Sequence, residues 1–499
     1  MNGELKKSFL KFDQMVILLL GIGLYFAIFT LTYLQWEDMG QFLSETAVLA
    51  RGQNLYRDIF EIKDPLFFVT STLSTLLIGR SGPYIVDAIA VALAAPVAYV
   101  ALKSLSIDKF KSAVGAVLFV GTLSGAYFQS FRTGTVCLVL ILCSIIAVNN
   151  GRLFTTGVIF AAVFGLKMPY IPFLVCPFVL GLKYLKTRWN FLRLISGFLS
   201  TILVIAGVLH MRGELIPYFE MVRINFEYRE MYPAIVGFNQ GISGYIDAVN
   251  RNGSSATLLI LVTICSWLLV LTSKTRKNWY VISSLAMLQL SVLFVIFTTA
   301  MWVHHLQMLC LFGFATYALA FTTTSRSLQK YPIYGLLVLV LIGINFQTVG
   351  FRIPIKPQQP IADVIQPKWI TPPEATYVIR YVNNSKKTIY FARLGPNDDL
   401  GLVSFLPNNW KLACPEYVQG GLEDVKWISK ITACMTEKPE IIFVSPGFFS
   451  LTRPAGYYEL LKSEAKKVLV DHYFCFSLPE RPGAEICEKK NGSLQSSGD

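Results

Sequence analysis

The segment between residues 35 and 82 gathers acidic side chains of the kind that exchange protons in enzymes. It begins after one strongly apolar stretch and is followed by another. Charges beside an apolar medium cost free energy unless water or a function accommodates them. A carboxylate near such a boundary can accept a proton near neutral pH, so these acids are candidates for general acid–base chemistry. The charged residues in question are Asp38, Glu45, Asp58, Glu61, Lys63 and Asp64.

The surrounding chain predicts a polytopic α-helical membrane protein. Of its 499 residues, 54% are hydrophobic and 15% are charged, whereas soluble proteins carry roughly 25% charged residues. Residues 14–34 reach the length of about 20 residues that crosses hydrocarbon, and no small-residue cleavage site follows them. The net charge of +13 follows the loops and forms no basic domain, which argues against a nucleic-acid partner.

Eleven apolar runs are expected to be transmembrane helices. A further run, 65–79, is short for a span and is interpreted as a re-entrant or interfacial segment. The loops assigned to the cytoplasm carry 13 Lys and Arg in 44 residues, and the alternate loops carry 6 in 57. This bias places the N-terminus in the cytoplasm and the C-terminus outside. The expected spans are 14–34, 83–102, 113–129, 134–148, 154–167, 170–182, 194–210, 256–272, 280–300, 303–322 and 332–350.

In this topology, the polar residues that do not serve to set the membrane orientation of the chain fall together on the outer face. The first loop 35–82, the turn 130–133 and the long loop 211–255 all fall there. The long loop opens with aromatic and charged residues at helical spacing, which favours an interfacial helix that packs on the bundle or lines an acceptor groove.

The chain changes character after the membrane body, residues 1–350. A proline-rich linker, 351–374, leads into a region, 375–499, where strand-like and helix-like runs alternate. Residues 386–394 and 440–447 read as buried strands, 457–467 as a helix, and 468–478 as another strand. Together they predict a small C-terminal α/β domain outside the cytoplasm.

The C-terminal region also contains four of the nine cysteines. In an oxidising compartment they could form up to two disulfides in three possible pairings, and free buried thiols are the alternative. No Cys-x-x-Cys spacing indicates a metal site. These residues are Cys414, Cys434, Cys475 and Cys487.

The first loop resembles the membrane glycosyltransferases of the GT-C fold, in particular the protein O-mannosyltransferase and aminoarabinose-transferase group. The shared pattern is an acid after the first span, a short helix ending at a glycine, a Tyr-x-Asp and a Lys-x-Pro-Leu turn. The likeness extends over residues 10–350, where it depends on topology. The matching positions are Asp38, Gly40, Ala47, Leu49, Gly52, Tyr56, Asp58, Lys63, Pro65 and Leu66.

This resemblance implies an inverting glycosyltransferase with a polyprenyl-phosphate-linked sugar as donor. The acceptor would be a glycan, a lipid or a protein. Asp38 matches the residue that acts as general base on the acceptor hydroxyl, which attacks the anomeric carbon. Asp64, Asp58 or Glu61 could supply a second acid. Asp64 stands where the family has the first proline of its Lys-Pro-Pro turn, and Asp87 stands in a span where relatives often have a basic residue.

The resemblance also implies cations that hold the phosphate of the leaving group. Lys63 matches the lysine of the family turn, and Lys167 matches one often found at an outer span end, although it could also snorkel. His304 resembles a family histidine at the start of a late span, with His305 in the alternate register. Arg132 could bind a phosphate bidentately or simply occupy the outer turn.

Some relatives hold the phosphate through a divalent cation. Candidate ligands in this chain are Asp38, Asp64 and His304, although none has metal-ligand spacing.

The alternative function is a multi-span transporter or lipid flippase, which would place polar residues near mid-membrane, often in two repeated halves. The chain shows no such repeat. The expected location is a cell membrane, preferably a bacterial inner membrane.

Overall fold

The computed structural model describes a predominantly helical protein. The described residues are 14–32, 38–60, 63–79, 81–124, 133–185, 187–231, 243, 256–272, 278–298, 307–324, 389–392, 414, 416–417, 425–444, 459–477 and 485–490. Most of the chain up to residue 324 is helix, and the strands of the larger sheet lie between residues 389 and 489.

The helical body begins with α2 (Gln14–Thr32), α3 (Asp38–Ala50) and α4 (Pro65–Ile78). The following helices are α5 (Gly82–Ser104), α6 (Lys109–Leu123), α7 (Gly134–Asn149), α8 (Leu153–Leu166), the 3₁₀ helix η1 (Met168–Leu174), α9 (Val175–Gly181), α10 (Arg188–Met211), α11 (Leu215–Met231), α13 (Ala256–Thr272), α14 (Trp279–Thr298) and α15 (Leu309–Thr324). Helix α5 is alanine-rich and packs against α2, α6 and α7, so the core passes through it.

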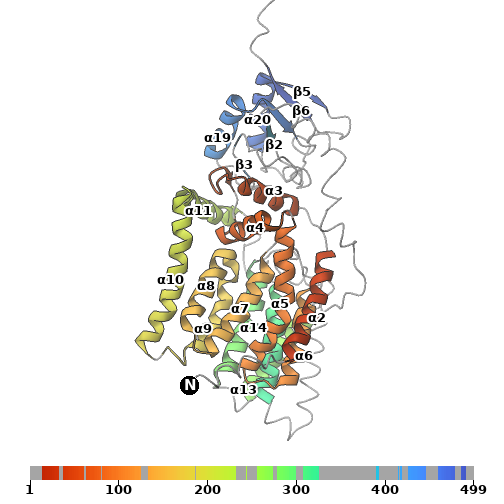
Figure 1. The fold of residues 1–499 in the computed structure, drawn as a ribbon, viewed down its shortest axis with the longest axis vertical. Helices are drawn as coiled ribbons and strands as arrows, with labels where there is room; N and C mark the ends of the chain where they lie inside the picture. Colours follow the sequence, from red (N-terminus) through yellow and green to blue (C-terminus); the bar gives the residue numbers. More distant parts are fainter. Residues whose placement is uncertain are drawn as a thin grey trace, which may run out of the picture.

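Two groups of helices differ in direction. Helices α2, α5, α7, α8 and α10 run along the bundle, whereas α3, α4 and α11 lie across one end of it (Figure 1). The crosswise direction of α4 agrees with the prediction that 65–79 does not cross the bundle. The helix expected at the start of the long loop is present as α11, and its interfacial placement stays a prediction.

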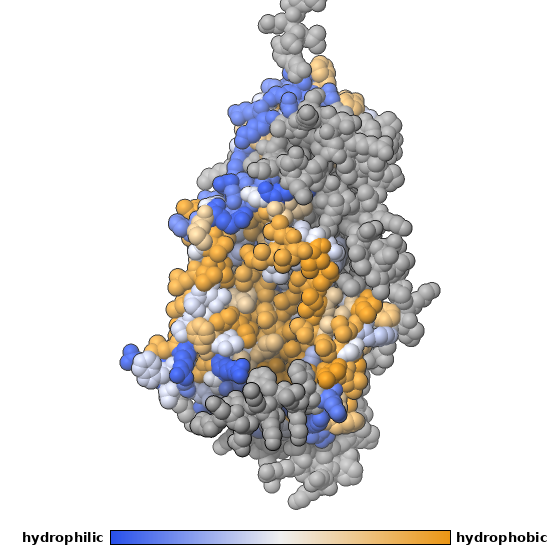
Figure 2. Space-filling view, in the orientation of Figure 1, coloured by the Kyte–Doolittle hydropathy of each residue, from blue (hydrophilic) through white to orange (hydrophobic). Residues whose placement is uncertain are grey.

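Within the described part of the chain, α5 and α10 are long and apolar enough to cross a membrane. Several other apolar helices are shorter, and the run 332–350 lies outside the described residues. Most of the expected spans therefore have a helical counterpart, while the number of eleven spans stays a prediction. A broad apolar band covers the middle of the body on the face shown in Figure 2, with polar residues at both ends.

Helices α8 and α10 approach each other through paired glycines. A Cβ atom on Gly157 would lie 2.1 Å from the carbonyl oxygen of Leu194, and one on Gly197 would lie 2.1 Å from that of Phe154. Small residues at a crossing point allow two helix backbones to come into contact, as is common inside membranes.

The C-terminal region contains a sheet with strand order β2-β4-β6-β5 among the described residues. Strand β2 (Ile389–Ala392) is parallel to β4 (Ile441–Val444), and β6 (Glu485–Lys489) is antiparallel to β4 and to β5 (Tyr473–Ser477). Helices α19 (Val425–Glu437) and α20 (Glu459–His472) accompany the sheet. The strands expected in 386–394 and 440–447 are therefore present.

The strand expected at 468–478 begins five residues later in the structure, at Tyr473. Helix α20 continues to His472, and β5 starts at Tyr473. Ala465 and Leu469 are both buried four residues apart while Val470 is exposed, so the helical period of the preceding segment extends through the apolar run.

The C-terminal cysteines form disulfides. Cys414 pairs with Cys434, and Cys475 pairs with Cys487, which is one of the three pairings that the sequence allowed. The second bridge joins residues directly opposite each other on β5 and β6.

The close contact of α8 and α10 at Gly157 and Gly197 can be tested with a control on the same helix. Gly197→Ala is expected to destabilise the protein by about 1–3 kcal/mol because the new methyl group meets the backbone of α8. Gly207→Ala, on the same helix with open space around it, is expected to be neutral or slightly stabilising. Thermal unfolding of both variants in detergent gives the comparison, and equal stability of the two would contradict the proposed backbone contact.

Candidate functional site

Lys63 and the described acids of the first loop lie at the end of the bundle covered by α3 and α4. Helix α3 begins at Asp38 and ends at Ala50, and Gly52 follows with a φ of 87°, the left-handed conformation that often terminates a helix. This agrees with the expected helix end at Gly52. The backbone of Asp38 is described, but its side chain and all of Glu61 are not.

Lys63 lies beside the first turns of α3. Its Nζ atom stands 5.4 Å from the ring centroid of Phe42, a cation–π contact. Phe42 follows Asp38 by four residues on the same helix, so the two positions lie on one helical face. The structure therefore brings Lys63 to the face of α3 that carries Asp38.

Asp64 connects the first loop to a distant break in the helices. It is 9% exposed and occupies the N-cap position of α4, with Pro65 as the first helical residue. Its side chain does not cap α4; instead Oδ2 accepts a hydrogen bond of 2.8 Å from the backbone N–H of Met168. The carboxylate thus joins α4 to the start of η1.

Lys167 lies in that same break, between α8 and η1. Its backbone is extended, with φ −164° and ψ 94°, and its N–H still donates to the carbonyl of Val163, closing α8. Its Nζ atom stands 5.3 Å from the ring centroid of Tyr170. Because Met168 is the next residue, Asp64 and Lys167 carry opposite charges at neighbouring points of the fold.

A buried tyrosine supports the turn before Lys63. Tyr56 is fully buried with a φ of 62°, and its hydroxyl donates to the carbonyl of Lys63 at 2.7 Å. Its ring packs 5.3 Å from that of Tyr218 on α11. Burial, followed by the charge of Asp64, raises the pKa of Tyr218, which places α11 within electrostatic range of Asp64.

Asp58 has the contacts of a turn-forming residue. It accepts a hydrogen bond of 2.9 Å from the backbone N–H of Asn54 and pairs with the neighbouring Arg57 at 3.1 Å. These contacts account for its place in the turn. Its role as a second acid stays a prediction.

Glu214, the buried acid just before α11, was not among the site residues predicted from the sequence. It is 2% exposed, and its Oε1 accepts hydrogen bonds from the backbone N–H of Leu55 at 2.8 Å and from Arg212 Nε at 2.9 Å. Arg212 also donates to the carbonyl of Gln53 at 2.9 Å. Burial raises the pKa of Glu214, and Arg212 partly opposes the shift. The Arg-Gly-Glu that ends an apolar run was the available signal.

Glu214 and Arg212 also border a mostly apolar pocket of ≈ 390 Å³ between α3, α4 and α10. Such a volume and lining suit a hydrocarbon chain or another apolar group. The lining residues are Leu49, Ala50, Gly52, Leu55, Pro65, Phe68, Val69, Thr72, Leu73, Leu76, Val208, Leu209, Arg212 and Glu214.

The ends of three further elements meet in a buried polar cluster. Gln307 donates to Thr135 Oγ1 at 2.8 Å at the start of α7. The Tyr170 hydroxyl and Gln307 Oε1 both lie close to Gly134. A Cβ atom on Gly134 would stand 2.7 Å from the Tyr170 hydroxyl oxygen and 2.3 Å from Gln307 Oε1. Arg132, His304 and His305 lie outside the described residues.

Asp87, the acid found in a span, is buried near the start of α5 at 4% exposure. Tyr84, one turn earlier on the same helix, is also buried at 4%. This acid lies on a different element from Asp64 and Lys167.

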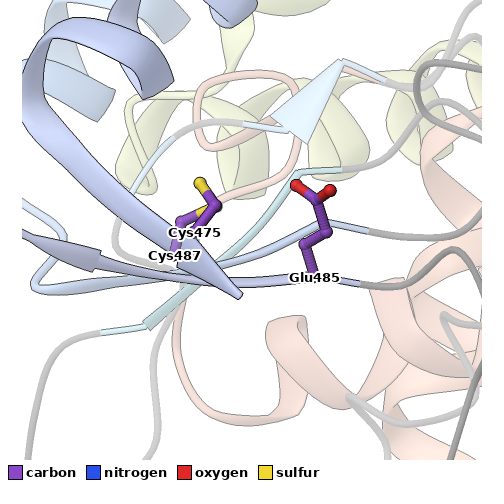
Figure 3. Close-up of side chains that lie close together, drawn as sticks. All are labelled: Cys475, Glu485 and Cys487. Carbon is purple, nitrogen blue, oxygen red and sulfur yellow. A yellow bond between two sulfur atoms is a disulfide. The ribbon is translucent and has the colours of Figure 1, made fainter. Parts of the chain in front are cut away.

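The proposed cation ligands are only partly described. Asp64 is already engaged by Met168, while the Asp38 side chain and His304 lie outside the described residues. Figure 3 shows another group with metal-ligating side chains, Cys475, Glu485 and Cys487, in the C-terminal sheet. Its two sulfur atoms form a disulfide, so they are not thiolates that could bind a metal.

The C-terminal region contacts the first loop directly. Strand β1 (Ile59–Phe60) pairs in parallel with β3 (Glu416–Tyr417), and Lys430 Nζ donates to the carbonyl of Arg57 at 3.0 Å. Partial burial lowers the pKa of Lys430, although the charge of Asp58 opposes the change. The first loop thus contacts both the bundle and the C-terminal region.

No protein-family model matches this chain, and no curated protein matches its sequence. The described geometry and the resemblance of the first loop are therefore the grounds for a functional proposal.

The Glu214 contacts make a stability prediction. Glu214→Ala is expected to lower the free energy of unfolding by about 1–3 kcal/mol because the buried Leu55 N–H loses its acceptor. Glu220→Ala, an exposed acid on the same helix, is expected to leave stability nearly unchanged. Thermal unfolding of the purified variants measures the difference, and similar values for both would refute the anchoring role of Glu214.

The raised pKa of Glu214 makes a separate prediction. The folded state holds this proton more tightly than the unfolded state, so stability should fall as pH rises from the ordinary value of 4.5 through the raised pKa. Glu214→Gln should reduce this slope. Unfolding measured across that pH range tests the sign, and an unchanged slope in the variant would count against it.

Proposed function

We propose that the protein is an inverting glycosyltransferase that moves a sugar from a polyprenyl-phosphate donor to an acceptor at the outer face of a membrane. The observation that carries the proposal is the apolar pocket beside the charged first loop. A lipid-linked donor needs both features together: an apolar surface for its chain and cations for its phosphate.

The pocket and the charges share the same structural elements. Pro65 lines the pocket, while Asp64 and Lys63 immediately precede it. Leu49 and Ala50 line the pocket from the C-terminal end of α3, the helix that begins at Asp38. A donor chain in the pocket would therefore pass close to the start of α4, where Lys63 and Asp64 lie.

A membrane location fits the surface of the body. Helix α10 exposes Leu199, Leu203 and Val204, each at 50% or more. Such side chains are stable against lipid tails and costly in water. We place the bundle in a membrane with eleven spans and with the C-terminal region on the outer side. The membrane that we favour is the inner membrane of a bacterium.

In the proposed reaction, the acceptor hydroxyl loses its proton to the Asp38 carboxylate as its oxygen attacks the anomeric carbon. The bond between that carbon and the phosphate oxygen breaks, and the electron pair leaves with the lipid phosphate. Lys63 and Lys167 supply positive charge for the departing phosphate, with Arg132 and His304 as further candidates.

A divalent cation would share this task in a metal-dependent version of the reaction. Asp38, Asp64 and His304 offer the oxygen and nitrogen ligands that such a cation accepts.

The proposal predicts that Asp38→Asn lowers the transfer rate by about 10²–10⁴-fold, the usual contribution of a general base. Membrane insertion should be unchanged, because an amide replaces a carboxyl of the same shape. Transfer in membranes from a complemented deletion strain measures the effect, and lipid analysis of the deletion strain should show an accumulated polyprenyl-phosphate sugar.

Glu220→Gln provides the matched control, since this acid is exposed on α11 away from the pocket lining. Full transfer by Asp38→Asn would reject the base assignment. A deletion strain that accumulates a lipid-linked sugar on the cytoplasmic face, with transfer intact in opened vesicles, would instead support a flippase.

A further inference from the structure

We propose that Asp64 is a positioning residue that clamps the break between α8 and η1 and thereby holds Lys167 toward the donor phosphate. The inference deepens the proposed function and depends on it for the identity of the ligand. It assigns Asp64 a role distinct from proton transfer.

The clamp is a hydrogen bond between parts of the chain 104 residues apart. Asp64 has the extended backbone of an N-cap residue, with φ −69° and ψ 151°, yet its carboxylate makes no capping bond to α4. An N-cap aspartate normally accepts from the first turn of its own helix. Here the carboxylate is directed at Met168, which shows that its contact is with another element.

Met168 is a donor that needs an outside partner. It opens η1, and the N–H groups at the start of a helix have no acceptor within that helix. Asp64 is 9% exposed, so the bond is shielded from water, and a charged acceptor strengthens it. Loss of the acceptor would leave the first residue of η1 unanchored to α4.

Lys167 immediately precedes Met168, the residue that Asp64 anchors, and its own backbone is bonded on both sides. On one side its N–H closes α8, and on the other its carbonyl accepts from Tyr170 N–H at 3.0 Å. Its ammonium group stands over the ring of Tyr170, which is fully buried against Gly134. Asp64 fixes the backbone one residue after Lys167, and Tyr170 directs the side chain.

The test separates the acceptor oxygen of Asp64 from its charge. The amide oxygen of Asp64→Asn can still accept the Met168 N–H, whereas Asp64→Ala cannot. Farnesyl phosphate serves as the probe, with binding measured on the full-length chain in phosphatidylcholine nanodiscs. Hydrogen exchange of the peptide covering residues 163–174 reports the clamp itself, whether or not the probe binds.

Asp64→Ala is expected to weaken farnesyl phosphate binding about ten- to a hundredfold, the size of the charged contact between Lys167 and the phosphate that the clamp maintains. Lys167→Ala should do the same, and the double variant should lose little more, because both act through one contact. Asp64→Asn should bind as tightly as the wild type or more tightly. Exchange should accelerate in Asp64→Ala and stay slow in Asp64→Asn.

Unchanged exchange in Asp64→Ala, additive losses in the double variant, or an Asn variant as weak as the Ala variant would each overturn the positioning role. Absence of farnesyl phosphate binding by the wild type, with the exchange result as expected, would reject the proposed donor class and leave the clamp standing. Thermal unfolding of the Asp64 variants shows that each is folded before binding is compared.

Discussion

The end of the bundle covered by α3 and α4 is organised by the need of buried backbone groups for hydrogen-bond partners. Where helices stop or start, their terminal N–H and C=O groups lack partners within the helix. In this protein Met168, at the start of η1, finds such a partner in Asp64. The loop residue Leu55 donates to Glu214, and within the first loop the Tyr56 hydroxyl donates to the Lys63 carbonyl. The first two bonds fix the first loop on the bundle more specifically than apolar contact would, and the third stabilises the loop itself.

The same bonds explain how charged residues are maintained beside an apolar body. A buried carboxylate is stable when hydrogen bonds or a cation replace water. Glu214 has both, since Leu55 and Arg212 reach the same oxygen. Asp64 has its backbone donor and lies near the oppositely charged Lys167. The charges of the loop are therefore part of its architecture as well as candidates for chemistry.

Local sequence signals predicted much of this architecture. The apolar runs within the described residues correspond to helices, Gly52 follows the end of α3 as expected, and 65–79 forms the crosswise α4. The partners of Asp64 and Glu214 could not be predicted, because Met168 and Leu55 donate their backbone N–H groups. Nearly every residue has such a group, so the side-chain sequence does not mark which one a carboxylate will bind. The end of α20 was misplaced because Val468–Val470 suits both a strand and the buried face of a helix. The cysteine pairing needed the register of β5 and β6, which composition does not encode.

The parallel pairing of β1 with β3 has a consequence for the biogenesis of the protein. Ile59 meets Glu416, so the edge of the first loop must wait for a segment made hundreds of residues later. A growing chain that has already formed its early helices would still present this short edge without its partner strand. The pairing of β1 with β3 joins segments hundreds of residues apart, so it can form only after the chain has been made as far as Tyr417.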